Sequence, residues 1–150
     1  MFKKILVPID GSKPSDHALV AALDVAEKYG STITLMHVIE PLTYPISPYP
    51  SSGDVTSAPF WIDDYYQKTR ENSKKMLNEA TELAKKRSPN TEIKTTLDEG
   101  RPARHILIEA ENHDLIIIGS RGLGEIRGIF LGSVSHQVVN EAKIPVLVVK

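Results

Sequence analysis

The sequence contains no cysteine among its 150 residues. Disulfide bonds, thiolate nucleophiles and cysteine-based zinc sites are therefore excluded, and the composition suits a reducing cytoplasm. Excess charge of one sign is also missing, because 18 basic and 19 acidic residues give a net charge of −1. Proteins that bind nucleic acid or membrane surfaces broadly usually have a basic excess, so we expect neither partner.

Long apolar runs are absent as well. The apolar run at 115–119 is far shorter than the ~18 residues that a membrane-spanning helix needs. The chain enters the apolar residues 5–9 almost at once, without a long hydrophobic region or cleavage site, which predicts a first strand and no signal peptide. With 41% hydrophobic and 25% charged residues, we expect a single cytoplasmic domain over residues 1–150.

Glycine and proline are concentrated in two segments. Five of the nine glycines lie within residues 119–132, and five of the ten prolines lie within residues 41–59. Proline disfavours the interior of helices and sheets, so residues 41–60 are predicted to be a loop insertion. This loop is either a surface connection without a function or a segment that contacts a partner.

Short β-branched runs alternate strictly with segments of helical spacing. Such alternation predicts an α/β protein, in which a parallel sheet lies between two layers of helices as a doubly wound three-layer sandwich. The predicted strands are 3–9, 33–39, 92–97, 114–118 and 145–149, and the predicted helices begin near residues 12, 62, 102 and 133.

The long helix predicted over residues 62–87 has an apolar stripe and a charged face. The stripe is expected to face the sheet and the charges to face solvent. The predicted stripe is Tyr66, Thr69, Ser73, Met76, Leu77, Ala80, Leu83 and Ala84, and the charged face is Glu71, Lys74, Lys75, Glu79, Glu82, Lys85 and Lys86.

Two predicted strand ends have unusual chemistry. Asp10 follows the first strand, and the glycine-rich residues 119–133 follow the fourth. A glycine-rich segment before a helix N-terminus offers N–H donors and a positive dipole, which predicts an anion site. Ser133 is predicted to be the helix N-cap, and Arg121 and the Ser135 hydroxyl would favour a phosphate. Turn geometry alone remains the alternative for the glycines, as it does for Asp10.

Several familiar sites are not matched. The residue before Ser133 is Gly132 and not the lysine of a Walker A motif, and Arg127 stands where a dinucleotide fingerprint needs glycine. Ser133 and His136 lack the G-x-S-x-G context of a hydrolase. The histidines show no metal-ligand spacing. They are His17, His37, His105, His113 and His136.

The spacing Gly119-x2-Gly122-x9-Gly132-Ser133 resembles the G-2x-G-9x-G-(S/T) motif of the universal stress protein family, in its ATP-binding subgroup. The resemblance covers the whole chain, because the first strand, the second strand end, the fourth strand and the last helix and strand match in order. It implies a Rossmann-like sheet of five parallel strands in the order 3-2-1-4-5.

The same resemblance implies a nucleotide site. The family binds ATP, usually with a divalent cation such as Mg²⁺ or Mn²⁺. Asp10 would contact the ribose hydroxyls and the backbone at Val38 would read the adenine. The residues implied to bind nucleotide are Pro8, Ile9, Asp10, Val38, Ile118, Gly119, Arg121, Gly122, Gly132, Ser133, Val134 and Ser135.

The resemblance further implies a homodimer paired through the last strand, at Val146, Leu147, Val148 and Val149. We expect a nucleotide-dependent regulatory or stress-response module with at most slow ATP hydrolysis. One alternative is an adenine-nucleotide hydrolase or transferase, for which the sequence identifies no catalytic base. Another is a dimeric interaction protein that binds no nucleotide.

Overall fold

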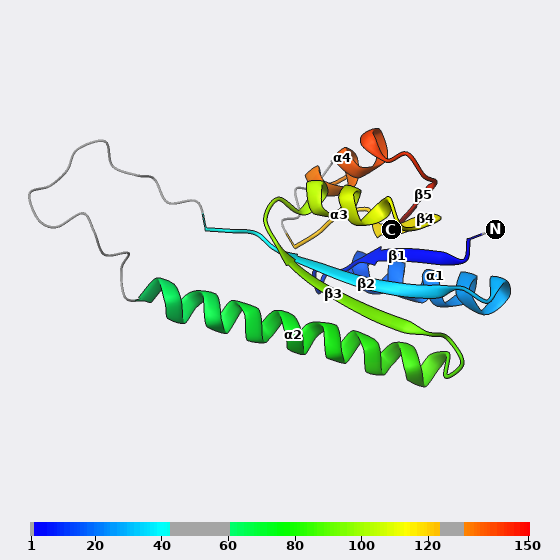
Figure 1. Cartoon of the computed structure of the whole chain (residues 1–150), viewed down its shortest axis with the longest axis horizontal. Coiled ribbons are helices and arrows are strands. Elements are labelled where there is room, and N and C mark those ends of the chain that lie inside the picture. Colours follow the sequence, from blue (N-terminus) through cyan, green and yellow to red (C-terminus); the bar gives the residue numbers. More distant parts are fainter. Residues whose placement is uncertain (1, 43–60, 124–130) are drawn as a thin grey trace, which may run out of the picture.

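The computed structural model describes residues 2–42, 61–123 and 131–150. Most of the predicted proline-rich loop and Gly124, Arg127 and Gly128 lie outside these residues. Strands and helices alternate along the chain (Figure 1). The elements are β1 (Lys4–Pro8), α1 (Lys13–Tyr29), β2 (Thr32–Ile39), α2 (Trp61–Arg87), β3 (Ile93–Glu99), α3 (Pro102–Ala110), β4 (Leu115–Gly119), α4 (Ser133–Glu141) and β5 (Val146–Val149).

All neighbouring strands pair in parallel, and the sheet order is β3-β2-β1-β4-β5. Figure 1 shows α3 and α4 on one face and α2 on the other, where α1 joins it in the core. The predicted fold class is therefore confirmed. Since the strands are parallel, their carboxyl ends lie along one edge of the sheet, where ligands of doubly wound folds bind.

The two central strands are buried on both faces, as their continuous apolar sequences predict. Ile5 and Ile117 face the α1–α2 side, and Leu6 and Ile116 face the α3–α4 side, each with no exposed surface. The edge strand β5 differs, because its Leu147 is 42% exposed. Its apolar sequence is therefore only partly covered within one copy of the chain.

Helix starts are set by local hydrogen bonds and backbone shape. Ser12 is the N-cap of α1, and its hydroxyl accepts the N–H of Ser15 at 3.3 Å. The prediction for α4 was wrong by one residue, since Gly132 is the N-cap and Ser133 is the first helical residue. The Gly132 N–H donates to the Ser120 carbonyl at 2.8 Å, which fixes the chain at the cap position.

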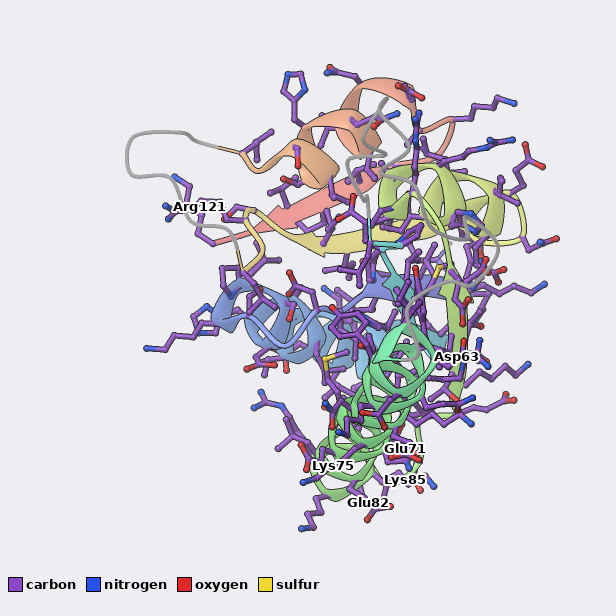
Figure 2. The ribbon with its side chains drawn as sticks, turned by 90° about the vertical axis from the view of Figure 1, so that its left-hand side faces the viewer. Asp63, Glu71, Lys75, Glu82, Lys85 and Arg121 are labelled. Carbon is purple, nitrogen blue, oxygen red and sulfur yellow. The ribbon has the colours of Figure 1, made fainter. Side chains whose placement is uncertain are left out.

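The charged face predicted for α2 is exposed, and Figure 2 shows Glu71, Lys75, Glu82 and Lys85 projecting from this helix. Within the described residues, no helix is both long and apolar enough to cross a membrane. The predicted inner stripe is mostly correct, because Leu77 and Ala84 are buried. Leu83 was assigned wrongly, and its side chain is 50% exposed. Six residues at about 100° each place it about 120° around the helix from Leu77, away from the sheet.

These two leucines give a matched test of the packing. We expect Leu77→Ala to lower the free energy of unfolding by about 2–5 kcal/mol, because it removes buried methyl groups from the α2–sheet contact. Leu83→Ala, on the same helix, should change it by less than about 0.5 kcal/mol. Urea denaturation followed by circular dichroism measures both. Equal effects of the two substitutions would contradict the observed orientation of α2, in which Leu77 is buried and Leu83 is exposed.

Candidate functional site

The carboxyl ends of β1 and β4 meet through Asp10 and the segment after β4. Oδ1 of Asp10 accepts the N–H of Ser12 at 3.0 Å. Oδ2 faces Gly122 so closely that a Cβ on this glycine would overlap it. The Ser12 hydroxyl donates to the Arg121 carbonyl at 3.3 Å. One carboxylate oxygen is thus used in the turn, while the other lies against the glycine-rich segment.

One of the motif glycines is required by the protein's own backbone, and a second is in close contact with a side chain. A Cβ on Gly119 would lie 2.7 Å from the carbonyl carbon of Pro14 and 2.8 Å from the nitrogen of Ser15, closer than real Cβ contacts. At Gly122 the neighbour is the Asp10 carboxylate. A Cβ on Gly132 would lie 3.4 Å from its nearest neighbour, Cα of Arg121, so the space around this glycine is less tight. Close internal packing is therefore one physical reason for this glycine pattern, independent of any ligand.

The two sides of the glycine-rich segment are tied together at Ser120. Its carbonyl accepts the Gly132 N–H at 2.8 Å and the Ser135 hydroxyl at 2.8 Å. The Ser135 hydroxyl also lies 3.0 Å from the Gly132 carbonyl. The proton of Ser135 is thus used within the protein, whereas the Ser133 side chain is exposed at the start of α4. The two predicted hydroxyl ligands therefore differ in what they can offer.

Two buried polar atoms in this segment have no hydrogen-bond partner among the described residues. They are Oγ of Ser120, a residue only 1% exposed, and Nε of the partly buried Arg121. Figure 2 places Arg121 close to the end of β4, apart from the labelled charged residues of α2. An unpartnered buried polar atom is unfavourable and uncommon in folded proteins, which marks this segment as a candidate functional site.

The backbone of Val38 faces the same region. The ladder between β1 and β2 ends at Met36, whose carbonyl accepts the Ile9 N–H at 2.8 Å. On the opposite side, the Ile39 carbonyl accepts the Gly100 N–H at 2.9 Å. Because peptide groups alternate in direction along a strand, the N–H and C=O of Val38 point to the β1 side, beyond the last ladder pair.

The predicted site residues gather at the ends of β1, β2 and β4 and the start of α4. Their burial separates them into three groups. Pro8, Ile9, Val38, Ile118, Gly119 and Ser135 are buried; Asp10, Arg121, Gly122, Gly132 and Val134 are partly exposed, and Ser133 is exposed.

A pair that the sequence did not predict lies at the end of β3. Nδ1 of His105 is 2.5 Å from Oδ2 of Asp98. The hydrogen bond from His105, with a second from the Glu99 N–H, holds the pKa of Asp98 below its ordinary value of 3.8. Gly100 has φ +145°, and a Cβ there would overlap the imidazole ring. The spacing of these residues matches no known motif, so only the turn between β3 and α3 brings them together.

Histidine and carboxylate side chains form no larger cluster in the described part of the chain. No three of them lie where they could bind a metal ion together. An ion pair at the end of β3 joins Glu99 to Arg70 of α2. The last two residues of β3 therefore contact helices on opposite faces of the sheet: Asp98 contacts α3 and Glu99 contacts α2.

The pKa of the Asp98 carboxyl should lie below 3.8, because its charged form accepts a hydrogen bond from His105. When the pKa of a carboxyl is lower in the folded protein than in the unfolded chain, it stabilises the fold at pH values above the unfolded pKa. This stabilisation is lost as the pH falls through the folded pKa. In His105→Ala we expect the Asp98 pKa to rise toward 3.8. An NMR titration of the side-chain carboxyl measures it. An unchanged pKa in this variant would show that His105 is not the cause.

The two glycines should respond differently to alanine. Gly119→Ala should lower the free energy of unfolding by about 1–3 kcal/mol, because the new methyl group meets rigid backbone of α1. Gly122→Ala meets only the end of a flexible side chain and should cost less than about 1 kcal/mol, with the Asp10 carboxylate displaced. Thermal and urea denaturation compare the pair. A larger loss at Gly122 would contradict this assignment.

The fold and this arrangement define a doubly wound α/β protein with a glycine-rich segment at the carboxyl edge of its sheet. The universal stress protein family model matches residues 1–150. The chain is 34% identical to the universal stress protein YxiE of Bacillus subtilis, with 100% of both chains covered. It is 36% identical to a universal stress protein of Thermus aquaticus, again over 100% of both. The chain therefore belongs to the universal stress protein family.

Solved structures agree with the fold. The universal stress protein UspA of Lactobacillus plantarum has a TM-score of 0.82 at 21% identity, covering 99% of this chain and 98% of that one. A universal stress protein solved in complex with cAMP has a TM-score of 0.70 at 23% identity, over 99% and 96%. One from Archaeoglobus fulgidus, in complex with dAMP, has a TM-score of 0.66 at 21% identity, over 99% and 98%.

Proposed function

We propose that this chain binds ATP and acts as a dimeric, nucleotide-dependent regulatory or stress-response module with at most slow ATP hydrolysis. The main support is the position of Asp10, whose Oδ2 faces Gly122 while Oδ1 is used by the Ser12 N–H. A carboxylate oxygen beside a glycine-rich segment suits a ribose hydroxyl next to its phosphates. The relatives in complex with cAMP and dAMP make an adenine nucleotide the natural ligand class.

In this proposal the phosphates lie on the glycine-rich segment and the start of α4. A helix N-terminus attracts anions through free N–H groups and its dipole, and the Ser133 side chain is exposed in the first turn of α4. Arg121 adds positive charge. Ser135 would contribute mainly by shaping the segment, since its proton goes to Ser120. The phosphate residues are Gly119, Arg121, Gly122, Gly132, Ser133, Val134 and Ser135.

The adenine would lie against the end of β2. The N–H and C=O of Val38 present a donor and an acceptor side by side, which suits N1 and the exocyclic amine of adenine. Guanine has a carbonyl and an N–H at these positions, so the same backbone would repel it. Pro8, Ile9 and Ile118 would line the nucleoside with apolar surface.

In the described part of the chain, few side chains near this segment could bind a divalent cation. Within the described residues, the Asp10 carboxylate lies against Gly122, and no three histidine or carboxylate side chains are grouped where they could bind a metal. We therefore expect Mg²⁺ or Mn²⁺ to be bound mainly by the phosphate oxygens. When bound, the cation supplies charge neutralisation for the triphosphate.

The enzyme alternative needs a base near the terminal phosphate. The Asp98–His105 pair resembles an oriented base, but it lies at β3, three strands from β4. With strands about 4.8 Å apart, the separation is about 14 Å across the sheet. This distance favours a binding module over a fast hydrolase or transferase.

We further propose that residues 1–150 form one domain that acts in the cytoplasm as a homodimer. The support is the edge strand β5, in which Leu147 is 42% exposed and Val146, Val148 and Val149 are partly exposed. An apolar edge strand favours pairing with another strand. A second copy of β5 would cover these side chains and satisfy the free edge.

Asp10→Asn tests the nucleotide site. We expect it to weaken ATP binding at least about tenfold, because a hydrogen bond to a charged group contributes about 1.5–3 kcal/mol. Isothermal titration with ATP and magnesium measures the affinity. Asp16→Asn is the matched control, since Asp16 is an exposed acidic residue in the first turn of α1, and it should bind within about twofold of the unmodified chain.

Three outcomes would contradict the proposal. No binding at millimolar ATP would favour the nucleotide-free interaction protein. Equal affinity in Asp10→Asn would show that the ribose lies elsewhere. Steady hydrolysis at about 1 s⁻¹ or faster, measured as phosphate release, would favour the enzyme alternative.

A further inference from the structure

The hydrogen-bond ladder between β1 and β2 stops one bond short of its regular course. At its start, the Thr32 N–H donates to the Lys3 carbonyl at 2.9 Å, and at its end the Ile9 N–H donates to the Met36 carbonyl at 2.8 Å. In a regular parallel ladder the next bond would join the Val38 N–H to the Ile9 carbonyl. Within the described residues that bond is absent, because the paired register of the two strands ends at Met36.

The side chain of His37 takes the place of the missing bond. Its Nδ1 lies 2.8 Å from the Ile9 carbonyl oxygen. A carbonyl oxygen can only accept a hydrogen bond, so Nδ1 carries the proton and donates it. The imidazole thus uses the acceptor that a continued ladder would give to Val38. The Val38 N–H, which points toward β1, therefore has no ladder partner in the part of the chain that the structure describes.

The same hydrogen bond holds the turn that carries Asp10. The Ile9 carbonyl belongs to the peptide group that joins Ile9 to Asp10. On the other side of this peptide, the Asp10 N–H lies 3.5 Å from Oγ of Ser15, and Oδ1 of Asp10 accepts the Ser12 N–H at 3.0 Å. At 2.8 Å, the bond from His37 is the shortest of the three. His37 therefore fixes the backbone from which the Asp10 carboxylate extends.

We propose that His37 is a positioning residue of the nucleotide site, which keeps the Val38 N–H available to adenine and fixes Asp10 for the ribose. The inference rests on the proposed function and extends it, because it assigns base specificity to a side chain that need not touch the base. Without the imidazole, the Ile9 carbonyl and the Val38 N–H would be unpaired one ladder step apart. Closing the ladder would satisfy both groups, and adenine N1 would lose its donor.

Hydrogen exchange in the nucleotide-free protein tests the ladder directly. In His37→Leu we expect the Val38 N–H to exchange about tenfold more slowly, measured relative to Thr32, because it gains a hydrogen bond to Ile9. Thr32 is the internal reference, since its bond to Lys3 lies at the far end of the same ladder. His37→Asn retains a side-chain N–H donor close to the position of Nδ1 and should exchange like the unmodified chain. Unchanged or faster exchange at Val38 in His37→Leu would overturn the proposal.

Base specificity is the functional measurement. Isothermal titration with ATP and with GTP should show that His37→Leu reduces the preference for ATP about tenfold, which is the effect of about one hydrogen bond. His37→Asn should restore most of this preference. A general loss of stability would weaken both nucleotides equally and leave their ratio unchanged.

His113 provides a matched control at the opposite edge of the sheet, just before β4. It is also partly buried, and its Nδ1 lies 2.8 Å from a main-chain carbonyl, that of Glu109. His113→Leu should lower the free energy of unfolding but change neither the ratio of ATP to GTP affinity nor the exchange at Val38.

A double-mutant cycle tests the ribose half of the proposal. In a chain that already has Asp10→Asn, the loss of ATP affinity caused by His37→Leu should be about threefold smaller, because part of that loss acts through the Asp10 carboxylate. Losses that multiply independently would overturn this half.

The outcomes separate the role of His37 from the proposed function. If the unmodified chain binds ATP but His37→Leu keeps the same ratio of ATP to GTP affinity, the role of His37 is wrong and the proposed function stands. If His37→Asn behaves like His37→Leu, the hydrogen bond to Ile9 is not what this histidine supplies. If the unmodified chain binds no ATP, the proposed function is wrong and the assignment of His37 to it is wrong as well.

Discussion

The end of β4 passes so close to the first turn of α1 that Gly119 cannot have a side chain without overlapping Pro14 and Ser15. The rest of the site depends on this contact. It brings Arg121 within reach of the Ser12 hydroxyl and Gly122 within reach of the Asp10 carboxylate. A larger residue at 119 would separate β4 from α1 and pull apart the groups that β1 and β4 place together.

The contact is possible because β1 and β4 are neighbours at the centre of the sheet. Both strands are buried on both faces, so their positions are fixed by packing and not by the site. The chain enters α1 after β1 and α4 after β4, and these two helices pack on opposite faces of the sheet. At the edge of the sheet, β3 is held differently, by Asp98 with His105 on one face and Glu99 with Arg70 on the other.

Most of the fold could be predicted from the sequence, because element type depends on local spacing and on short stop signals. The sheet order followed from the resemblance to the family and is confirmed. The errors lie where neighbours in space decide. Leu83 fits the apolar count of α2 but lies on its outer side, and the N-cap of α4 is Gly132 because its N–H is held by Ser120. The Asp98–His105 pair joins two elements and has no signature along the chain.

The sequence by itself determined the alternation of strands and helices, the buried central strands, and the grouping of Asp10 and the glycine-rich segment at one edge, because periodicity and parallel strands imply these. Val38 was added to that group only by the resemblance to the family. Only the tertiary structure decided why residue 119 must be glycine and that Gly122 lies against the Asp10 carboxylate, since the contacting atoms come from residues more than 100 positions away. It also decided that the Ser135 proton is used by Ser120 and that Ser120 reaches Val149. Hydrogen bonds and close approach between distant segments are set by packing, which local spacing does not encode.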